Sequence, residues 1–397
     1  MSKVIVLREA YDWINEGDIT STQFEELLVY IKKHYNESIV ELQHKRLRFI
    51  NYIGVIQCTD IRYEIVPKIT LSATDDRKAL LSMLAVTNFL PISFQRHIQN
   101  GTEQADLLEA FLITFTNHLL HELQKGVYKT YERHEENLYT LKGKLQLQRH
   151  IQKNAFSKVK AYCEFDEHTM DNALNRLLKL ALLIVKRTVK TSKCQHQIAR
   201  CLGYLDDVTV ISKMQPITFS RQNERFRNVA SFAQMIIEKS AIYSNGTSTT
   251  SFSFLLPMNL LFEAYIEVAL RTAFGTEKIL SQHAEIKLLR NKKSGKGNIL
   301  LKPDFVINET ILLDTKWKAA SYNGRNNYVQ SDIYQMYAYV TAYKQATRCI
   351  LLYPQQEHEG ELPIWEVIDT EKTIEMHTIR LDCFENSVAD LKKLLGK

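Results

Sequence analysis

This chain of 397 residues lacks several patterns that identify common classes of protein. No run of about 18 apolar residues occurs, so we expect no membrane-spanning helix. The first residues, Met1–Glu9, lack the apolar core and the cleavage site of a signal peptide. The cysteines show no C-x-x-C spacing, and we interpret them as reduced cysteines of a cytoplasmic protein rather than as metal ligands. They are Cys58, Cys163, Cys194, Cys201, Cys349 and Cys383.

A nucleotide-binding motif of the Walker type is also absent. The sequence contains no G-x-x-x-x-G-K-[S/T], and the nearest stretch, Ser294–Gly297, lacks the upstream glycine. We therefore expect no phosphate-binding loop of this kind in the chain. Translocation or other work driven by nucleotide hydrolysis would require a second protein.

Length and composition favour a globular protein with two domains. The hydrophobic fraction is 45%, and 397 residues are too many for one ordinary domain. A net charge of +6 permits a polyanionic partner but does not require one. The polar, glycine-bearing stretch Tyr243–Ser251 is the most plausible boundary. It separates residues 1–243, an expected partner-binding domain, from residues 252–397, an expected nuclease domain.

The expected fold class is mixed, α+β or α/β. Short strands predominate in the first 70 residues, and amphipathic helices follow them up to the boundary. Residues 137–151 alternate between polar and apolar side chains, which predicts strand pairing. In this first domain we expect strands over 46–52, 55–58 and 61–66, and helices over 21–34, 75–90, 104–124, 170–190 and 222–241.

The most informative stretch is Lys302–Lys318, which predicts a β-hairpin. Two apolar, β-rich runs, 299–307 and 310–317, read as its strands. Asn308 and Glu309 lie between them as the turn.

Two carboxylates and a lysine come together on this hairpin. Successive side chains of a strand point to opposite faces, so Asp314 and Lys316 share one face, and Asp304 on the other strand reaches the same point. Two carboxylates at one point repel each other unless a cation lies between them, and Mg²⁺ prefers few carboxylates plus waters and phosphate oxygens. Bound Mg²⁺ would activate a water and neutralise a phosphate, and Lys316 would hold that water or stabilise the developing charge. We predict a nuclease with Mg²⁺ on Asp304 and Asp314, although an ordinary exposed hairpin accounts for these residues taken alone.

Two flanking helices extend this pattern. A helix beginning near Pro257 carries Glu263 beside its apolar face, either as a third acid of the site or as an ordinary surface glutamate. A second helix, over Ser331–Val340, places Gln335 and Tyr339 four residues apart on one face. We expect Gln335 to bind a DNA phosphate or to support the lysine, and Tyr339 either to contact DNA or to belong to the core.

A basic loop precedes the strand that carries Asp304. Ser294 and two glycines mark it as flexible, and Lys292, Lys293 and Lys296 are candidates for contacts with DNA phosphates. A solvated hairpin tip is the alternative interpretation.

The outline expected for this second domain is αβββαβ. Residues 288–299 suggest a further hairpin arm, and residues 346–353 predict a buried strand. A short amphipathic helix is expected from Ser387, with that serine as its N-cap.

Together these residues resemble the PD-(D/E)xK nuclease superfamily, with Asp314 at the D/E position and Gln335 and Tyr339 as a Q-x-x-x-Y element. Blocks upstream extend the resemblance to the McrC family, the endonuclease subunit of McrBC-type modification-dependent restriction systems. The similarity covers roughly residues 45 to 345. Its blocks are Tyr63–Ile69, Arg77–Leu84, Leu141–Leu145 and Phe165–Lys179, in this order, with Lys142-Gly143-Lys144 where many relatives have Arg-Gly-Arg.

The resemblance implies a Mg²⁺-dependent DNA endonuclease with a restriction-endonuclease-like C-terminal domain. It implies as partner a McrB-like AAA+ GTPase hexamer, which binds the GTP, recognises methylated cytosine and is stimulated by the N-terminal part of this chain. In the block ending at Lys179, Asp171 or Asn172 is expected to cap a helix. Candidates for contacting the partner, with a solvated surface as the alternative, are Arg133, Lys142, Lys144 and Arg149.

Two other functions are compatible with the sequence. One is a PD-(D/E)xK repair nuclease that acts alone, and the other is a non-catalytic assembly factor that stimulates a GTPase.

Overall fold

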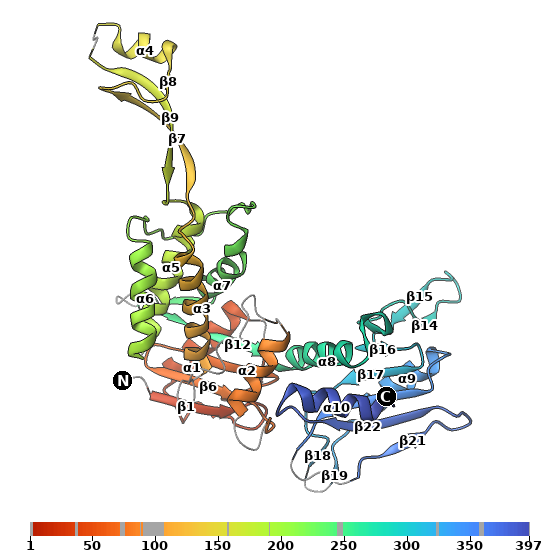
Figure 1. Cartoon of the computed structure of the whole chain (residues 1–397). Coiled ribbons are helices and arrows are strands. Elements are labelled where there is room, and N and C mark those ends of the chain that lie inside the picture. Colours follow the sequence, from red (N-terminus) through yellow and green to blue (C-terminus); the bar gives the residue numbers. More distant parts are fainter. Residues whose placement is uncertain are drawn as a thin grey trace. The chain divides into compact units, whose positions relative to one another are not determined.

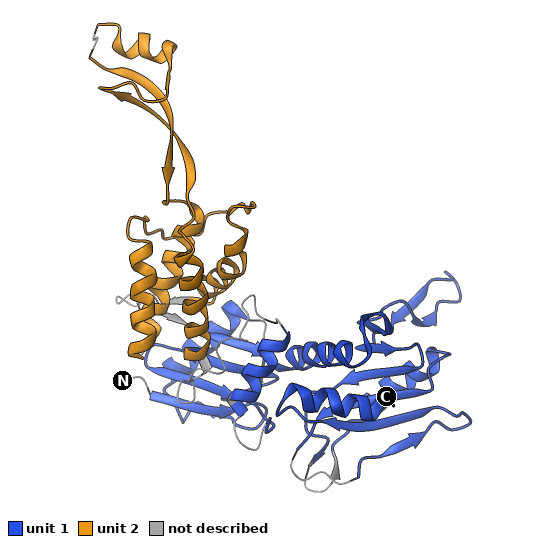
Figure 2. Cartoon of the chain, in the orientation of Figure 1, with its two compact units in different colours: residues 1–108, 253–397 blue, residues 109–252 orange. Residues whose placement is uncertain are grey.

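The computed structural model describes most of the chain, and the chain divides into two compact units. One unit combines residues 1–108 with 253–397, and the other is residues 109–252 (Figure 2). The division expected from the sequence, into a partner-binding part (1–243) and a nuclease part (252–397), stays a prediction. Part of the boundary stretch between them lies outside the described residues. The described residues are 3–35, 39–71, 76–87, 89, 107–156, 159–189, 191–243, 249–322, 325–356 and 361–396.

The first unit begins with an N-terminal sheet whose strands are, in spatial order, β1 (Lys3–Arg8), β6 (Ile61–Val66), β5 (Tyr52–Gln57) and β12 (Phe254–Pro257). β1 pairs parallel with β6, and the other pairs are antiparallel. Gly54 makes the pairing of β5 with β12 possible, because its φ is +138° and a Cβ there would lie 2.0 Å from the carbonyl oxygen of Phe254. The sheet therefore joins the start of the chain to the segment that follows the second unit.

The other elements expected near the start of the chain are confirmed with small changes in their bounds. α1 covers Ser21–His34, and Thr20 with Gln23 forms a capping box at its N-terminus. The remaining elements here are β2 (Ile14–Asn15), β3 (Val40–Gln43), β4 (Arg46–Phe49) and α2 (Asp76–Thr87).

A larger mixed sheet forms the rest of the first unit. Its strands are, in spatial order, β13 (Ile279–Ser281), β16 (Phe305–Ile307), β17 (Ile311–Thr315), β20 (Arg348–Pro354), β22 (Thr373–Ile379) and β21 (Ile364–Glu366). β17, β20 and β22 are parallel to one another, and β16 is antiparallel to β17. The mixed α and β fold class is confirmed.

Helices cover this larger sheet. α9 (Gln330–Ala342) connects the parallel strands β17 and β20, as a crossover must. Its residues Met336 and Val340 belong to the same buried core as Leu312 of β17 and Leu351 of β20. α8 (Met258–Phe274) and α10 (Phe384–Leu395) pack against each other and contact β17 and β22, respectively (Figure 1).

The expected strand over 299–307 is wrong in one respect, because the chain leaves the ladder in the middle of it. β15 (Gly297–Leu300) pairs with β14 (Lys287–Arg290) in a separate hairpin, which confirms the expected hairpin arm. β16 begins only at Phe305. Pro303 has no N–H to donate to a ladder, which favours a break in the strand just before β16.

The turn after β16 is confirmed, but the predicted cap of the last helix is wrong. Asn308 and Glu309 have φ values of +49° and +64°, as tight hairpin turns require. Ser387 lies inside α10, not at its start, because its hydroxyl bonds the carbonyl oxygen of Arg380 at 2.5 Å and the hydroxyl of Tyr265 at 2.8 Å. A further short hairpin joins β18 (Ser321–Tyr322) to β19 (Arg325–Asn326).

The second unit contains a group of helices and a long two-stranded arm. The helices are α3 (Leu107–Gln124), α5 (Ala173–Thr188), α6 (Ser192–Tyr204) and α7 (Arg227–Glu238). Phe115 of α3 stacks on Phe232 of α7 with ring centroids 5.6 Å apart. β10 (Ser240–Tyr243) and β11 (Thr249–Phe252) form a hairpin beside them. The sequence analysis did not include α6.

The arm, which we define as residues 130–169, extends away from the helices of its unit (Figure 1). β7 (Thr130–Leu138) pairs along its whole length with β9 (Ala161–Thr169), and β8 (Lys144–Leu145) adds to the outer end. The predicted strand pairing over 137–151 is therefore partly wrong, because residues from 147 onward form α4 (Leu147–Asn154). Gly143 lets the chain pass close against β9, since its φ is +69° and a Cβ there would lie 2.4 Å from the carbonyl oxygen of Glu164.

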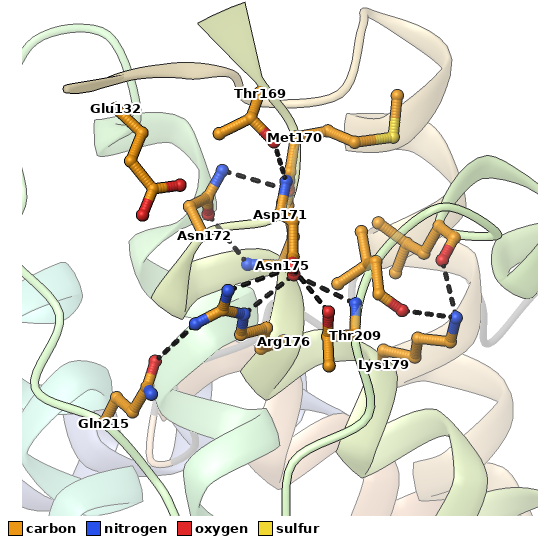
Figure 3. Close-up of polar contacts among 12 residues, drawn as sticks. Glu132, Thr169, Met170, Asp171, Asn172, Asn175, Arg176, Lys179, Thr209 and Gln215 are labelled. Carbon is orange, nitrogen blue, oxygen red and sulfur yellow. Dashed lines mark hydrogen bonds and ion pairs between the residues drawn. The ribbon is translucent and has the colours of Figure 1, made fainter. Parts of the chain in front are cut away.

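A polar cluster fixes the base of the arm to the start of α5 (Figure 3). Asn172 caps α5, as expected, by accepting a hydrogen bond from the backbone of Asn175 at 3.1 Å. Arg176 donates to both carboxylate oxygens of Asp171 at 2.7 and 2.9 Å, and the hydroxyl of Thr209 donates to the same carboxylate at 2.5 Å. These hydrogen bonds hold the pKa of Asp171 well below its usual range. The block 165–179 therefore serves to hold the arm in place.

Candidate active site

β17 carries Asp314 onto the sheet face that α9 covers. Side chains alternate along a strand, so Asp314 points to the same face as Leu312, which belongs to the core under α9. Its side chain is buried, with 4% of its surface exposed. An ionised carboxylate at such a depth requires compensating charges or hydrogen bonds.

Lys316 supplies the nearest compensating charge. Its Nζ lies 2.6 Å from Oδ2 of Asp314, 3.1 Å from Oε1 of Gln335 and 3.8 Å from Oδ1 of Asp332. Burial lowers the pKa of this lysine, but the surrounding carboxylates, Asp314 foremost, raise it above its usual value. Lys316 is therefore a cation close to both Asp314 and Asp332.

Asp304 lies immediately before β16, next to the end of β17. Both of its side-chain hydrogen bonds go to Oδ2, which accepts from the backbone N–H and from the hydroxyl of Thr315 at 2.7 Å each. Burial and the neighbouring charge of Asp304 raise the pKa of Asp314 to about 7. The charge of Asp304 therefore disfavours ionisation of Asp314, which is the electrostatic condition that a bound cation relieves.

Gln335 links α9 to the carboxylates and the lysine. Its Nε2 donates to the hydroxyl of Tyr339 at 2.7 Å and approaches Oδ1 of Asp314 at 3.5 Å, while its Oε1 accepts from Lys316. The hydroxyl of Tyr339 in turn donates to the carbonyl oxygen of Lys302 at 2.9 Å. Tyr339 is only 4% exposed, so it supports Gln335 from the core and presents almost no surface to DNA.

Glu263 of α8 lies at the edge of the site. Burial and the charge of Asp304 raise its pKa, and Nε2 of Gln282 donates to its carboxylate. No group of three or more His, Cys, Asp or Glu side chains is arranged as a metal site within the described residues. Asp304 and Asp314 nevertheless suit Mg²⁺, which is bound through one or two carboxylates and completes its shell with waters and phosphate oxygens.

The basic loop lies in the turn between β14 and β15. Lys292, Lys293 and Lys296 are all exposed there, and β14 contacts α9, the helix that carries Gln335. The hairpin therefore places a solvated positive charge on the element next to the site.

Three residues of the site were not selected from the sequence. Thr315, the middle residue of the Asp-x-Lys motif, orients Asp304 through two hydrogen bonds. Lys318 donates to Oδ2 of Asp332 at 2.6 Å, and Asp332 also approaches Lys316. Thr315 lies within the Asp-x-Lys motif and Lys318 lies two residues after it, so spacing offered a signal for both. Asp332 lies in the first turn of α9, and nothing in the sequence links it to a lysine.

Comparison with known proteins identifies the family to which this chain belongs. The sequence profile described as "McrBC 5-methylcytosine restriction system component" matches residues 47–354. The chain belongs to this family. The matched segment of this McrBC family member includes each residue of the site described above, and it confirms the resemblance drawn from the sequence blocks. No curated protein gives a match.

Two solved structures from Thermococcus gammatolerans are similar to this McrBC family member. One is a chain of the refined half-complex from a tetradecameric assembly of McrB AAA+ hexamers with bound McrC. It has 20% identity and a TM-score of 0.76, with 99% of this chain and 100% of that chain covered. The other belongs to a cryo-EM structure of the McrBC complex, with 22% identity, a TM-score of 0.55 and coverage of 69% and 89%. At these identities the similarity establishes a shared fold.

No helix among the described residues combines the length and the apolar character needed to cross a membrane.

Proposed function

We propose that this chain is the DNA-cleaving subunit of a GTP-dependent restriction system that acts on DNA with modified cytosine. The observation that carries the proposal is the convergence of Asp304, Asp314, Lys316 and Gln335 from three separate elements at one end of the larger sheet. Such a set matches the PD-(D/E)xK pattern, and the reaction is the hydrolysis of a phosphodiester bond. The membership in the McrBC family supports the same reading.

Each residue has a distinct role in the proposed reaction. Asp304 and Asp314 would hold Mg²⁺, which supplies an activated water and neutralises charge on the phosphate when bound. Thr315 keeps the carboxylate of Asp304 in one orientation. Lys316 holds its ammonium where negative charge develops on the phosphate, because its hydrogen bond to Gln335 limits its rotation.

Two supporting roles follow from burial. Tyr339 keeps the amide of Gln335 in place from the core. Glu263, whose pKa is raised, is suited to hold a water beside Asp304 rather than to serve as a permanent metal ligand.

The exposed lysines of the β14–β15 turn are proposed to bind the DNA backbone. Lys292, Lys293 and Lys296 are solvated, so they can neutralise phosphates without a desolvation cost. They lie on a hairpin whose first strand contacts α9, and DNA bound there would pass close to Gln335.

We propose that the arm contacts a McrB-like AAA+ GTPase hexamer. The arm exposes large apolar side chains, including Tyr139 at 74%, Leu141 at 67% and Ile151 at 64%, which is typical of a surface that a partner covers. Of the four cations considered from the sequence, Arg133 is paired with Glu164 and Arg149 with Glu135.

The other two cations of the arm differ from each other. Lys142 lies over the ring of Phe165, at 3.9 Å from the centroid. Lys144 is exposed and has no ion pair or hydrogen bond of its side chain within the described residues. Lys144 is therefore the arm cation that we expect to reach the GTPase.

The proposal is tested with the full chain, the GTPase partner, GTP, Mg²⁺ and DNA that contains methylated cytosine. Asp314→Asn should lower the cleavage rate by about a hundredfold or more, because several kcal/mol of charge stabilisation is lost, while stimulation of GTP hydrolysis persists. Asp390→Asn, which removes the half-buried ion-pair partner of Arg380, is the matched control and should cleave normally. Unchanged cleavage by Asp314→Asn would show that this site is not the nuclease active site.

The same assay separates the alternatives. Cleavage by the chain with Mg²⁺ but without the GTPase would identify a nuclease that acts alone. Stimulation of the GTPase without cleavage by the wild-type chain would identify an assembly factor. Lys144→Ala should reduce GTPase stimulation and leave the affinity of the isolated chain for DNA unchanged, with Lys392→Ala on α10 as its control.

A further inference from the structure

A buried carboxylate from the start of the chain contacts the segment that follows the active-site strand. Glu9 comes directly after β1 and is 0% exposed. Its Oε1 accepts a hydrogen bond from the indole N–H of Trp317 at 2.7 Å, although 308 positions separate the two residues. Its Oε2 is buried and has no hydrogen-bond partner in the described part of the chain. Trp317 is the residue immediately after Lys316.

One cation compensates this carboxylate. Nζ of Lys68 lies 4.0 Å from Oε2 of Glu9 and donates to Oδ1 of Asn51 at 2.7 Å. Burial raises the pKa of Glu9 and lowers that of Lys68, which is the cost of placing both charges inside the protein. Lys68 belongs to the block Tyr63–Ile69, to which neither the proposed nuclease chemistry nor the arm gives a role.

Trp317 is held on two sides. Its ring is 5% exposed and lies against Phe262 of α8, with centroids 5.7 Å apart. Phe262 precedes Glu263 in the chain. With the ring fixed by Phe262 and the N–H fixed by Glu9, the backbone between Lys316 and Lys318 has little freedom to shift.

Charged side chains form a second link between Lys68 and the candidate active site. The ammonium of Lys318 is close enough to lower the pKa of Lys68, and Lys318 is bound to Asp332, which also approaches Lys316. A series of charged side chains thus connects Lys68 with Lys316.

The stability of the fold does not by itself require an acid at position 9. Replacing a buried ion pair by apolar side chains of similar volume is often neutral or stabilising, because the charges no longer need to be desolvated. A fixed donor–acceptor geometry, on the other hand, is what an apolar residue cannot supply. This contrast favours a role in orientation.

We propose that Glu9 and Lys68 are positioning residues of the nuclease site, acting through Trp317 on Lys316 and Lys318. The inference rests on the proposed nuclease function and adds to it that the active site is built from both ends of the chain. The N-terminal sheet is accordingly part of the cleavage machinery.

The test measures single-turnover cleavage by the full chain in complex with the GTPase, at saturating DNA. Glu9→Leu and Trp317→Phe should each lower the rate constant by about ten- to hundredfold, the usual consequence of a small displacement of a catalytic group, with the Kd for DNA unchanged. Glu9→Gln keeps an oxygen that accepts from the indole and should restore most of the rate. Glu41→Leu, which removes the partner of Arg48 in the same part of the chain, is the control and should cleave like the wild type.

Two further measurements distinguish positioning from a general loss of stability. In chains labelled with 5-fluorotryptophan, the resonance of Trp317, assigned by its absence from Trp317→Phe, should move in Glu9→Leu and return in Glu9→Gln. The double variant Glu9→Leu/Trp317→Phe should lose no more rate than either single variant, since both break one connection.

Each outcome has a defined meaning. Normal rates in Glu9→Leu and Trp317→Phe, or losses that add in the double variant, would overturn the positioning role while leaving the nuclease intact. A wild-type complex that does not cleave at all would overturn the proposed function and, with it, this inference. If Glu9→Leu does not fold, Trp317→Phe carries the test, because it keeps an aromatic ring next to Phe262 and removes the indole N–H that Glu9 accepts.

Discussion

Thr315 and Asp304 are joined by two hydrogen bonds to a single oxygen. The backbone N–H and the hydroxyl of Thr315 both donate to Oδ2 of Asp304 at 2.7 Å. Because β16 and β17 are antiparallel neighbours, this contact ties the segment before one strand to the end of the other. Thr315, the middle residue of the Asp-x-Lys motif, therefore sets the orientation of the Asp304 carboxylate.

Thr315→Val should therefore weaken cleavage without unfolding the chain. Valine has a similar shape but no hydroxyl, so one of the two bonds to Asp304 is lost, and hydrogen bonds to charged groups contribute about 1.5–3 kcal/mol each. We expect the cleavage rate to fall about tenfold and the requirement for Mg²⁺ to shift to higher concentration. The measurement is a Mg²⁺ titration of cleavage, with Thr347→Val, at an exposed site remote from the motif, as the control. A normal titration curve for Thr315→Val would contradict this role.

Tyr339→Phe separates support of Gln335 from contact with DNA. The change removes only the hydroxyl that accepts from Gln335 and donates to Lys302, at a cost of about 1 kcal/mol. We expect a lower melting temperature and slower cleavage at saturating DNA, with the Kd for DNA unchanged. Tyr337→Phe is the matched control, because Tyr337 lies on the same helix and is 53% exposed. A weaker Kd with normal cleavage at saturation would instead point to a DNA contact by Tyr339.

Neutralising the turn of the β14–β15 hairpin should weaken DNA binding in a salt-dependent way. The triple variant Lys292→Gln/Lys293→Gln/Lys296→Gln removes three candidate phosphate contacts. Each contact contributes about 0.9 to the slope of log K against log salt, so the slope should fall by about 3. Fluorescence anisotropy at several salt concentrations measures it. A control with the same change of net charge, Lys344→Gln/Lys392→Gln/Lys393→Gln, should keep the wild-type slope, and equal slopes in both variants would contradict the assignment.

Asp171 should make the base of the arm sensitive to acid. Hydrogen bonds from Arg176 and then from Thr209 depress the pKa of Asp171 in the folded chain below the value of about 3.9 that an unfolded chain has. A depressed pKa stabilises the fold fully above the unfolded value, and the stabilisation is lost as the pH falls through the folded pKa. We therefore expect stability to decrease below about pH 4.

Asp171→Asn tests this expectation. At pH 7 the variant should be less stable by about 1–2 kcal/mol, the contribution of hydrogen bonds to a charged group at a partly exposed site. The difference from the wild type should shrink as the pH falls, which thermal unfolding at a series of pH values will measure. Glu224→Gln, which breaks the exposed pair with Arg227, should change little at any pH. A constant difference for Asp171→Asn between pH 7 and pH 3 would refute the depressed pKa.

The amino-acid sequence by itself predicted the parts of the fold that depend on local spacing. Helices over 21–34 and near 331–340 and the hairpin turn at Asn308 and Glu309 follow from periodicity and turn chemistry, which act over a few residues. The convergence of Asp314 with Lys316 follows from the two-residue repeat of a strand in the same way. The error at Ser387 has a different, non-local origin, because its hydroxyl bonds the buried hydroxyl of Tyr265, which is distant in the chain.

Only the tertiary structure decided which distant residues complete the site. Glu9 meets Trp317, and Asp332 meets Lys318, because sheets and helices bring together segments whose separation carries no pattern in the sequence. The same holds for the burial of Tyr339, since a tyrosine on a helix face can lie in a core or in solvent until its neighbours are placed. Periodicity determines the face on which a side chain stands, whereas packing between elements determines what that face meets.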